Sequence, residues 1–141
     1  MDIDIIIPIY NAFDFVKKCI ETVIEHTDLT QHTLLLVNDK STDERILPLL
    51  NSFIKENQSL NIILIDNKDN QGFVRTVNIG MQYSHHDVVL LNSDTEVTRN
   101  WLSKIQNCAY SKPAVATVTP LSNNATLASV PVFFFFFTIT P

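Results

Sequence analysis

The stretch Ile3-Asp4-Ile5-Ile6-Ile7-Pro8-Ile9, near the start of the chain, decides the fold. It is an almost continuous apolar run of strand length, which is typical of a strand buried on both faces of a parallel sheet. Directly after it, Asn11 can cap a helix, and Asp14 lies near the positive end of that helix. Apolar residues then recur at helical spacing as far as Ile24, so one face of this helix packs on the sheet.

The alternation of strand and helix continues along the chain. We predict further strands over residues 33–37, 61–65, 87–91 and 114–118, each an apolar run between helical patterns. Strands that alternate with helices indicate a three-layer α/β/α domain with a mainly parallel, Rossmann-like sheet. In such sheets ligands bind at the carboxyl ends of the strands.

Three later helices complete this pattern. Ser41, Thr42 and Asp43 offer caps for the second helix, and Pro48 fits its first turn, so this helix begins late. The third helix spans residues 73–83, with Gly80 as a weak point in its interior. The fourth surrounds Trp101.

The bulk composition sets limits on function. The chain has 141 residues, enough for one domain with a core, and carries a formal net charge of −5. Its ten basic residues are scattered, whereas a nucleic-acid binder carries a basic stripe. We therefore expect no nucleic-acid partner. An acidic protein that binds an anionic substrate needs local devices, such as a helix N-terminus or a bound cation.

The cysteines and the chain termini indicate a cellular location. Cys19 and Cys108 stand alone in apolar, helix-like surroundings, which indicates two small buried side chains in a reducing compartment. The acidic start lacks the features of a signal peptide, and no segment has the length of a membrane span. We expect a cytoplasmic protein, which is compatible with peripheral attachment at the inner face of the cell membrane.

The last residues differ from the rest. Residues 133–137 are five consecutive phenylalanines without amphipathic period, and exposed they would promote aggregation. We expect residues 1–128 to form the ligand-binding part of a larger domain. Residues 129–141 are then an atypical, truncated or aberrant tail, and the alternative is a buried strand.

Polar residues cluster directly after the predicted strands. Parallel strands bring such clusters to one edge of the sheet, where a cleft would form. Asp39 follows a buried strand, so we expect its carboxylate to point into that cleft. Asp94 is well placed to hold a hard divalent cation, which prefers oxygen ligands and binds through one or two carboxylates plus substrate phosphates. The alternative for Asp94 is a cap for the helix near Trp101.

Other polar residues have simpler explanations. Arg75 starts the third helix beside the same cleft, where it either pairs with a phosphate or is a surface arginine. His85 and His86 precede the fourth strand on the opposite edge, so we place them on the surface. His26 and His32 also lie away from the cleft, so a Ser-His-Asp or Cys-His arrangement is not expected.

Taken together, the clusters resemble glycosyltransferase family 2, whose members have the GT-A fold. The resemblance covers residues 3–128 and rests on motifs that are weak singly and specific in this order. The motifs are Pro8-Ile9-Tyr10-Asn11, Asn38-Asp39-Lys40-Ser41-Thr42-Asp43, Asn70-Gln71-Gly72-Phe73 with Asn78-Ile79-Gly80, Asn92-Ser93-Asp94-Thr95, and the later segment 119–126.

The resemblance implies a function. Members transfer a sugar from a nucleotide-diphosphate donor, with inversion, to a glycan or lipid-linked acceptor, as in cell wall or polysaccharide biosynthesis. Asp39 would contact the base, and Asp94 would take the last position of the family's Asp-X-Asp motif and bind Mn2+ or Mg2+. The expected donor-binding residues are Pro8, Tyr10, Asn11, Asp39, Asn70, Gly72, Arg75, Asn92 and Ser93.

This chain departs from the family in two ways. Asn92 stands where the metal motif begins with Asp, which puts the affinity for metal in question. The family's general base comes from a later part of the domain, and no residue here matches it, so the catalytic residue stays unknown. Three other readings compete: a non-catalytic nucleotide-binding module or inactive truncated homologue, a nucleotidyltransferase, and a dehydrogenase. The last two normally show a glycine-rich loop after the first strand, and residues 8–13 hold no glycine.

Overall fold

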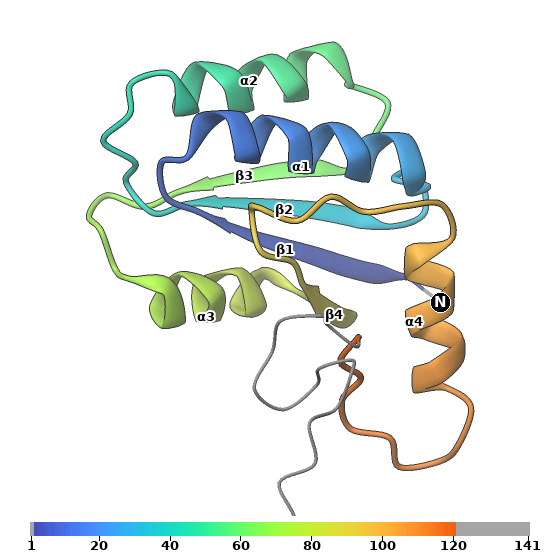
Figure 1. Cartoon of the computed structure of the whole chain (residues 1–141). Helices are drawn as coiled ribbons and strands as arrows, with labels where there is room; N and C mark the ends of the chain where they lie inside the picture. Colours follow the sequence, from blue (N-terminus) through green and yellow to red (C-terminus); the bar gives the residue numbers. More distant parts are fainter. Residues whose placement is uncertain (1, 121–141) are drawn as a thin grey trace, which may run out of the picture. The chain divides into compact units, whose positions relative to one another are not determined.

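The structure is a computed structural model that describes residues 2–120 of the chain. Strands and helices alternate within them, and these residues divide into two units, the first ending at Trp101 and the second beginning at Leu102. The elements, drawn in Figure 1, are β1 (Ile3–Ile9), α1 (Phe13–His26), β2 (Thr33–Asn38), α2 (Ile46–Glu56), β3 (Ile62–Asp66), α3 (Phe73–Tyr83), β4 (Asp87–Leu90) and α4 (Trp101–Ala109).

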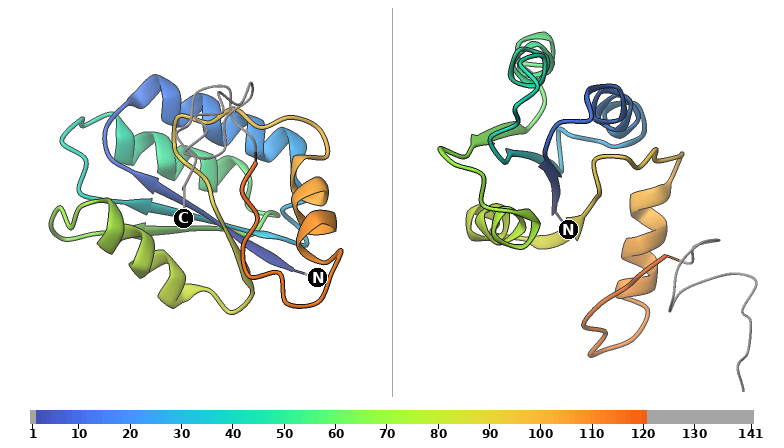
Figure 2. Two further views of the ribbon diagram at one scale, coloured as in Figure 1. Left: turned by 60° about the horizontal axis from the view of Figure 1, so that its bottom comes forward. Right: turned by 60° about the vertical axis from the view of Figure 1, so that its left-hand side comes forward.

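The first unit is the predicted three-layer α/β arrangement. Its four strands form one parallel sheet in the order β3-β2-β1-β4. Helices α1 and α2 cover one face of this sheet and α3 covers the other, as Figures 1 and 2 show. The fold class predicted from the alternating pattern is therefore confirmed.

Strand β1 lies at the centre of the core, and its sequence explains why. Ile5, Ile6 and Ile7 are fully buried between β2 and β4, as expected for a continuous apolar run. Pro8 would normally interrupt a central strand because it has no N–H to donate. Here β4 ends at Leu90, which pairs with Ile6, so Pro8 lies beyond the end of the ladder on that side. A proline can thus stand in the middle of the sheet without losing a hydrogen bond.

Gly80 is a packing position rather than the weak point expected from its helix propensity. It lies on the buried face of α3, and a Cβ placed there would come within 2.7 Å of Ile6 Cγ2 and 3.2 Å of Val37 Cγ2. Ile6 and Val37 are themselves fully buried, so neither can easily move aside. The missing side chain therefore lets α3 approach the sheet closely.

Gly80→Ala tests this close approach. We expect the free energy of unfolding to fall by about 1–3 kcal/mol, because overpacking outweighs the better helix propensity of alanine. Urea denaturation measures the change, and Gln82→Ala, on the exposed side of the same helix, is the matched control. A Gly80→Ala protein as stable as wild type would show that α3 can shift without cost.

Two sequence predictions are wrong, and a third lies outside the described residues. Residues 115–120 run without regular structure, so the strand expected at 114–118 does not form; Ala114 has φ 67°, outside the strand region. Cys19 is buried as expected, whereas Cys108, in α4, is exposed. The tail 129–141, with its phenylalanines, lies outside residues 2–120.

Among the helices within residues 2–120, none combines the length and apolarity that crossing a membrane requires.

Candidate functional site

The loops after β1, β2, β3 and β4 all start at the carboxyl edge of the sheet. The strand order makes β1 the point where the chain reverses direction across the sheet, with β2 and β3 on one side and β4 on the other. In open α/β sheets the crevice beside such a reversal is where ligands bind. The predicted polar clusters therefore follow strand ends that border the expected crevice.

Asn11 connects the loops after β1 and β2 and does not cap α1. The N-cap position of α1 is Ala12, which has no side-chain cap, and Asn11 itself has φ 57°. Its Oδ1 instead accepts hydrogen bonds from the backbone N–H of Thr42 at 2.8 Å and of Asp43 at 2.9 Å. Its own N–H donates to Ser41 Oγ at 2.9 Å. The prediction that Asn11 caps the following helix is thus wrong, because it serves the neighbouring loop.

The residues predicted to cap α2 also have other roles. Helix α2 begins at Ile46 without a side-chain cap, and Pro48 lies in its first turn as predicted. Ser41 Oγ donates to Asn38 Oδ1 at 2.6 Å, and the Asp43 carboxylate accepts from the Arg45 backbone N–H at 3.0 Å. These bonds shape the loop after β2, and they do not cap the helix that follows.

Asp39 is buried, with 4% of its surface exposed, and it holds the loop after β3. Its Oδ1 accepts from the Gln71 backbone N–H at 2.7 Å and from Asn67 Nδ2 at 3.0 Å. Its Oδ2 accepts from the Gly72 backbone N–H at 2.8 Å, and its carbonyl accepts from Asn70 Nδ2 at 3.2 Å. The carboxylate therefore lies against the start of α3. This differs from the sequence-based expectation that it points freely into a cleft.

This position gives Asp39 a structural role that the sequence analysis missed. The N-cap residue of α3 is Gly72, which has no side chain to cap the helix, and Asp39 holds the backbone N–H of Gly72 and that of Gln71 directly before the first turn. Burial raises the pKa of Asp39, but hydrogen bonds from Gln71, Asn67, Thr76 and Gly72 outweigh it and lower the pKa overall. The one available signal was a helix start with no Ser, Thr, Asp or Asn at its cap.

The acceptor sites of the Asp39 carboxylate are largely used within the protein. A carboxylate offers about four lone-pair sites, and Asp39 accepts hydrogen bonds from four groups, Gln71, Asn67, Thr76 and Gly72. A base or ribose donor would have to share or replace one of these bonds.

Asp94 lies in an exposed tight turn after β4. The Thr95 backbone N–H donates to the Asn92 carbonyl at 3.1 Å, and this bond closes the turn that carries Ser93 and Asp94. Asn92 and Asp94 are both exposed. The first amide of α4, that of Trp101, donates to the Thr98 carbonyl and not to Asp94. The Asp94 side chain is exposed to solvent.

The oxygen atoms of this turn suit a hard divalent cation that is shared with a ligand. Within residues 2–120, no three His, Cys, Asp or Glu side chains gather in a way that could hold a metal by themselves. Mg2+ and Mn2+ sites of the shared kind use one or two protein oxygens, and phosphate oxygens and water fill the other positions. Asp94 and the Asn92 amide fit such a site, and they do not fit a closed metal centre.

The other predicted donor-binding residues lie at the end of β1, in the loop after it, and between β3 and the first turn of α3. Pro8 is half-buried in β1, and Tyr10 beside it is 50% exposed. Gly72 has φ 76°, a conformation that favours glycine, and is exposed next to Asn70. Arg75 is exposed in the first turn of α3.

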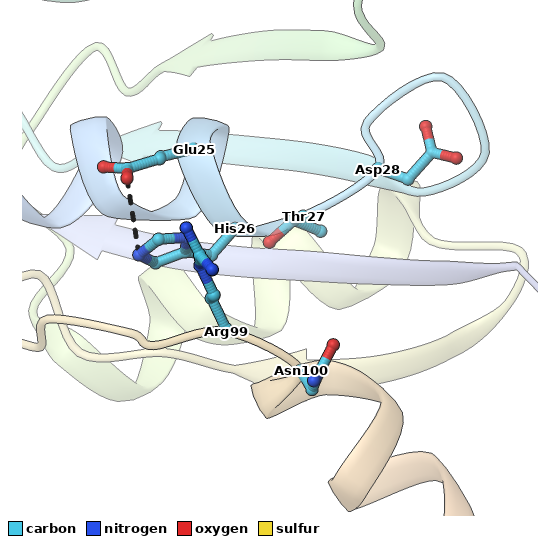
Figure 3. Close-up of a pocket in the computed structure, with 6 residues that line it drawn as sticks. All are labelled: Glu25, His26, Thr27, Asp28, Arg99 and Asn100. Carbon is cyan, nitrogen blue, oxygen red and sulfur yellow. Dashed lines mark ion pairs between the residues drawn. The ribbon is translucent and has the colours of Figure 1, made fainter.

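A separate depression of about 360 Å3 lies at the other edge of the sheet, where α1 ends. Figure 3 shows Glu25 pairing with His26, and Arg99 beside them. This depression mixes acidic and basic side chains and borders the negative end of α1, so it has no clear preference for an anion. It shares no residue with the predicted donor site. His32, also at this edge, accepts the Ile3 N–H on Nδ1 and is buried, and His85 and His86 are exposed as predicted.

The reactivities of the two cysteines test how closely the turn at residues 92–95 covers α1. Burial, with a further contribution from the charge of Asp94, raises the pKa of Cys19 to about 11, although the Thr95 backbone N–H opposes this. At pH 8 we expect an aromatic disulfide reagent to label exposed Cys108 at once and Cys19 at least about a hundredfold more slowly. Cys19→Ser and Cys108→Ser assign the two phases, and two equally fast phases in the folded protein would contradict the burial of Cys19.

Comparisons with known proteins agree with this arrangement. The family model described as "Glycosyl transferase family 2" matches residues 4–131. A relative named polypeptide N-acetylgalactosaminyltransferase 11, from Xenopus tropicalis, is 31% identical over 104 residues, which is 72% of this chain and 17% of that protein. The chain thus spans about a sixth of this relative's length.

Two solved structures share the fold. The mannosyltransferase PcManGT from Pyrobaculum calidifontis, in complex with GDP-Man and Mn2+, aligns with a TM-score of 0.72 at 17% identity, over 79% of this chain and 32% of that one. S. aureus TarS 1-349 in complex with UDP-GlcNAc aligns with a TM-score of 0.63 at 18% identity, over 75% of this chain and 30% of that one. Both likenesses concern the arrangement of the backbone.

Proposed function

This chain belongs to glycosyl transferase family 2, and from that premise we propose that it binds a nucleotide-diphosphate sugar together with Mn2+ or Mg2+. The binding region is the carboxyl edge of the sheet, from the loop that holds Asp39 to the turn that carries Asp94. The complete enzyme would transfer the sugar, with inversion, to a glycan or lipid-linked acceptor. Residues 2–120 would act as its donor-binding part.

The hydrogen-bonded loops at the carboxyl edge are the observation that carries this proposal. Asn11 joins the loops after β1 and β2, and Asp39 joins the loops after β2 and β3. Three loops from different parts of the sequence are therefore fixed relative to one another before any ligand arrives. Such preorganisation reduces the entropy cost of binding, which favours a specific small ligand at this edge.

The charges of the site explain why a cation is needed. The chain carries a formal net charge of −5, and both Asp39 and Asp94 belong to the proposed site. A diphosphate would be repelled there unless a divalent cation offset part of its charge. The solved mannosyltransferase with this fold holds GDP-Man together with Mn2+, and this supports the same pairing here.

The residues of this chain would bind and orient the donor. Asp39 would accept a hydrogen bond from the base or ribose in exchange for one of its present bonds, and Tyr10 and Pro8 would provide apolar contact. Asp94 and Asn92 would hold the cation, which, when bound, supplies Lewis-acid stabilisation of the leaving diphosphate. We assign no catalytic base among residues 2–120, so this part supports departure of the diphosphate and not activation of the acceptor.

Calorimetric titration of the whole chain with nucleotides tests this function. We expect uridine diphosphate to bind more tightly with Mn2+ than with a chelator, and uridine monophosphate to gain much less from Mn2+, since it lacks the second phosphate. Binding of neither uridine nor guanosine diphosphate, with or without metal, would refute donor binding. Sugar release from a labelled donor then separates an active transferase from a non-catalytic nucleotide-binding module.

A further inference from the structure

Helix α1, together with its C-cap residue Thr27, makes three hydrogen bonds to the stretch from Asn92 to Trp101, which carries Asp94. The Cys19 thiol donates to the Asn92 carbonyl at 3.6 Å, Thr22 Oγ1 accepts the Val97 N–H at 3.2 Å, and Thr27 Oγ1 accepts from Trp101 Nε1 at 3.0 Å. Figure 1 shows this segment, residues 91–100, running back along α1 after β4. The contacts thus follow the helix from its middle to its end.

The Thr22 hydrogen bond is the most deeply buried of the three. Thr22 and Val97 are 7% and 6% exposed, so the bond between them is shielded from water. The Thr22 hydroxyl uses its proton to donate to the Cys19 carbonyl at 3.0 Å, so its lone pairs remain for the Val97 amide. A buried N–H without an acceptor is unfavourable, so this bond gives the segment a strong preference for one position.

The Cys19 contact reaches the turn itself. The Asn92 carbonyl already accepts the N–H of Thr95 at 3.1 Å, which closes the turn around Ser93 and Asp94. The Cys19 thiol donates to this same oxygen, so the helix holds the acceptor on which the turn depends. No predicted site residue lies on this part of α1, and the sequence pattern indicated only that Cys19 is a small buried side chain.

We propose that Thr22 and Cys19 of α1 are positioning residues that hold the turn 92–95 so that Asp94 can bind the donor's cation. The inference deepens the proposed function and rests on it. Neither residue touches the ligand, because both are buried beneath the segment. Their effect is confined to the part of donor binding that requires the metal.

Thr22→Val, which keeps the shape and removes the hydroxyl, tests this role. In a Cys108→Ser background, the labelling rate of Cys19 reports whether the segment still covers α1. We expect labelling to become about tenfold faster, and the gain in uridine diphosphate affinity on adding Mn2+ to fall about fivefold to tenfold. The affinity measured with a chelator should stay unchanged, a result that a general loss of stability would not produce.

Matched variants separate this role from simple destabilisation. Thr22→Ser keeps the hydroxyl and should restore both measurements. Ser52→Ala removes a comparable bond in α2, from Ser52 Oγ to the Leu49 carbonyl at 2.7 Å, and should change neither. If Thr22→Val does not fold, Cys19→Ala tests the same turn from its other contact, and it too should reduce the Mn2+ gain.

Two results would overturn the inference. A Thr22→Val or Cys19→Ala protein with the full wild-type gain from Mn2+ would do so, while the proposed function would stand. A wild-type protein with no gain from Mn2+ at all would remove both the metal site and its positioning. The wild-type titration therefore distinguishes failure of the function from failure of the positioning role.

Discussion

Asp39→Ala is expected to lower the free energy of unfolding by about 3 kcal/mol. The substitution leaves the buried Asn67 amide and the backbone N–H groups of Gln71 and Gly72 without their acceptor. A buried donor left without its acceptor costs about 1–3 kcal/mol. Relaxation of the loop and entry of water would recover part of this sum.

Urea denaturation measures the loss, and Asp69→Ala is the matched control because Asp69 is an exposed carboxylate of the same loop. We expect the control to change stability by less than about 0.5 kcal/mol. Equal stabilities of the two variants would show that Asp39 does not hold the start of α3. Donor binding by Asp39→Ala, measured under conditions where it remains folded, should also be weaker.

The pH dependence of the free energy of unfolding provides a second test of the role of Asp39. Hydrogen bonds lower the pKa of Asp39 in the folded protein despite its burial. Its contribution is therefore fully present above the usual aspartate pKa of about 3.9 and is lost as the pH falls through the lower folded pKa. Asp39→Asn should remove this part of the acid dependence, and an unchanged acid limb in that variant would assign it to other carboxylates.

Asp94→Ala is expected to abolish the gain in nucleotide affinity that Mn2+ provides, a loss of about tenfold or more, which corresponds to about 1.4 kcal/mol. Asp94 is exposed, so its removal should leave the urea midpoint unchanged, in contrast to Asp39→Ala. Calorimetry with uridine diphosphate, with Mn2+ and with a chelator, measures the effect. Affinity in the presence of the chelator should match that of wild type.

Glu96→Ala is the control for this second prediction, because Glu96 is an exposed carboxylate of the same segment. It should retain the full gain from Mn2+. If Glu96→Ala lost the gain and Asp94→Ala kept it, the cation would have to be assigned to Glu96. If both variants kept it, neither carboxylate of this segment would be a ligand.

The fold could be predicted from the sequence because local pattern and tertiary structure agree. The run from Ile3 to Ile9 is buried throughout, apart from the half-buried Pro8, and α3 spans 73–83 as its pattern predicted. Where the pattern was short, the prediction was wrong: residues 115–120 have the residue types of a strand but no regular structure in the part of the chain described. Strand residues need a neighbouring strand, which a local pattern does not specify.

The position of the candidate site residues at the carboxyl edge of the sheet could also be predicted, whereas the contacts among them could not. Parallel strands place their carboxyl ends at one edge, which located Asn11, Asp39 and Asp94. The partners of these residues lie about 30 positions away in the sequence, as with Asn11 and Thr42 or Asp39 and Gly72. Helix-capping rules consider only adjacent residues, so they assigned Asn11 to its own helix and left α3 without a cap. Likewise, no rule based on neighbouring residues predicts the hydrogen bond from the Val97 N–H to Thr22.

Nuclear magnetic resonance of the labelled whole chain, titrated with uridine diphosphate and Mg2+, tests most directly whether one ligand occupies the carboxyl edge. The backbone amides of residues 71–72, held by Asp39, and of residues 92–95, around Asp94, should shift together with a single dissociation constant. Replacing Mg2+ with Mn2+ should then broaden the signals of residues 92–95 most strongly. Shifts confined to one of these loops, or centred on the depression at Asp28 and Arg99, would contradict the account.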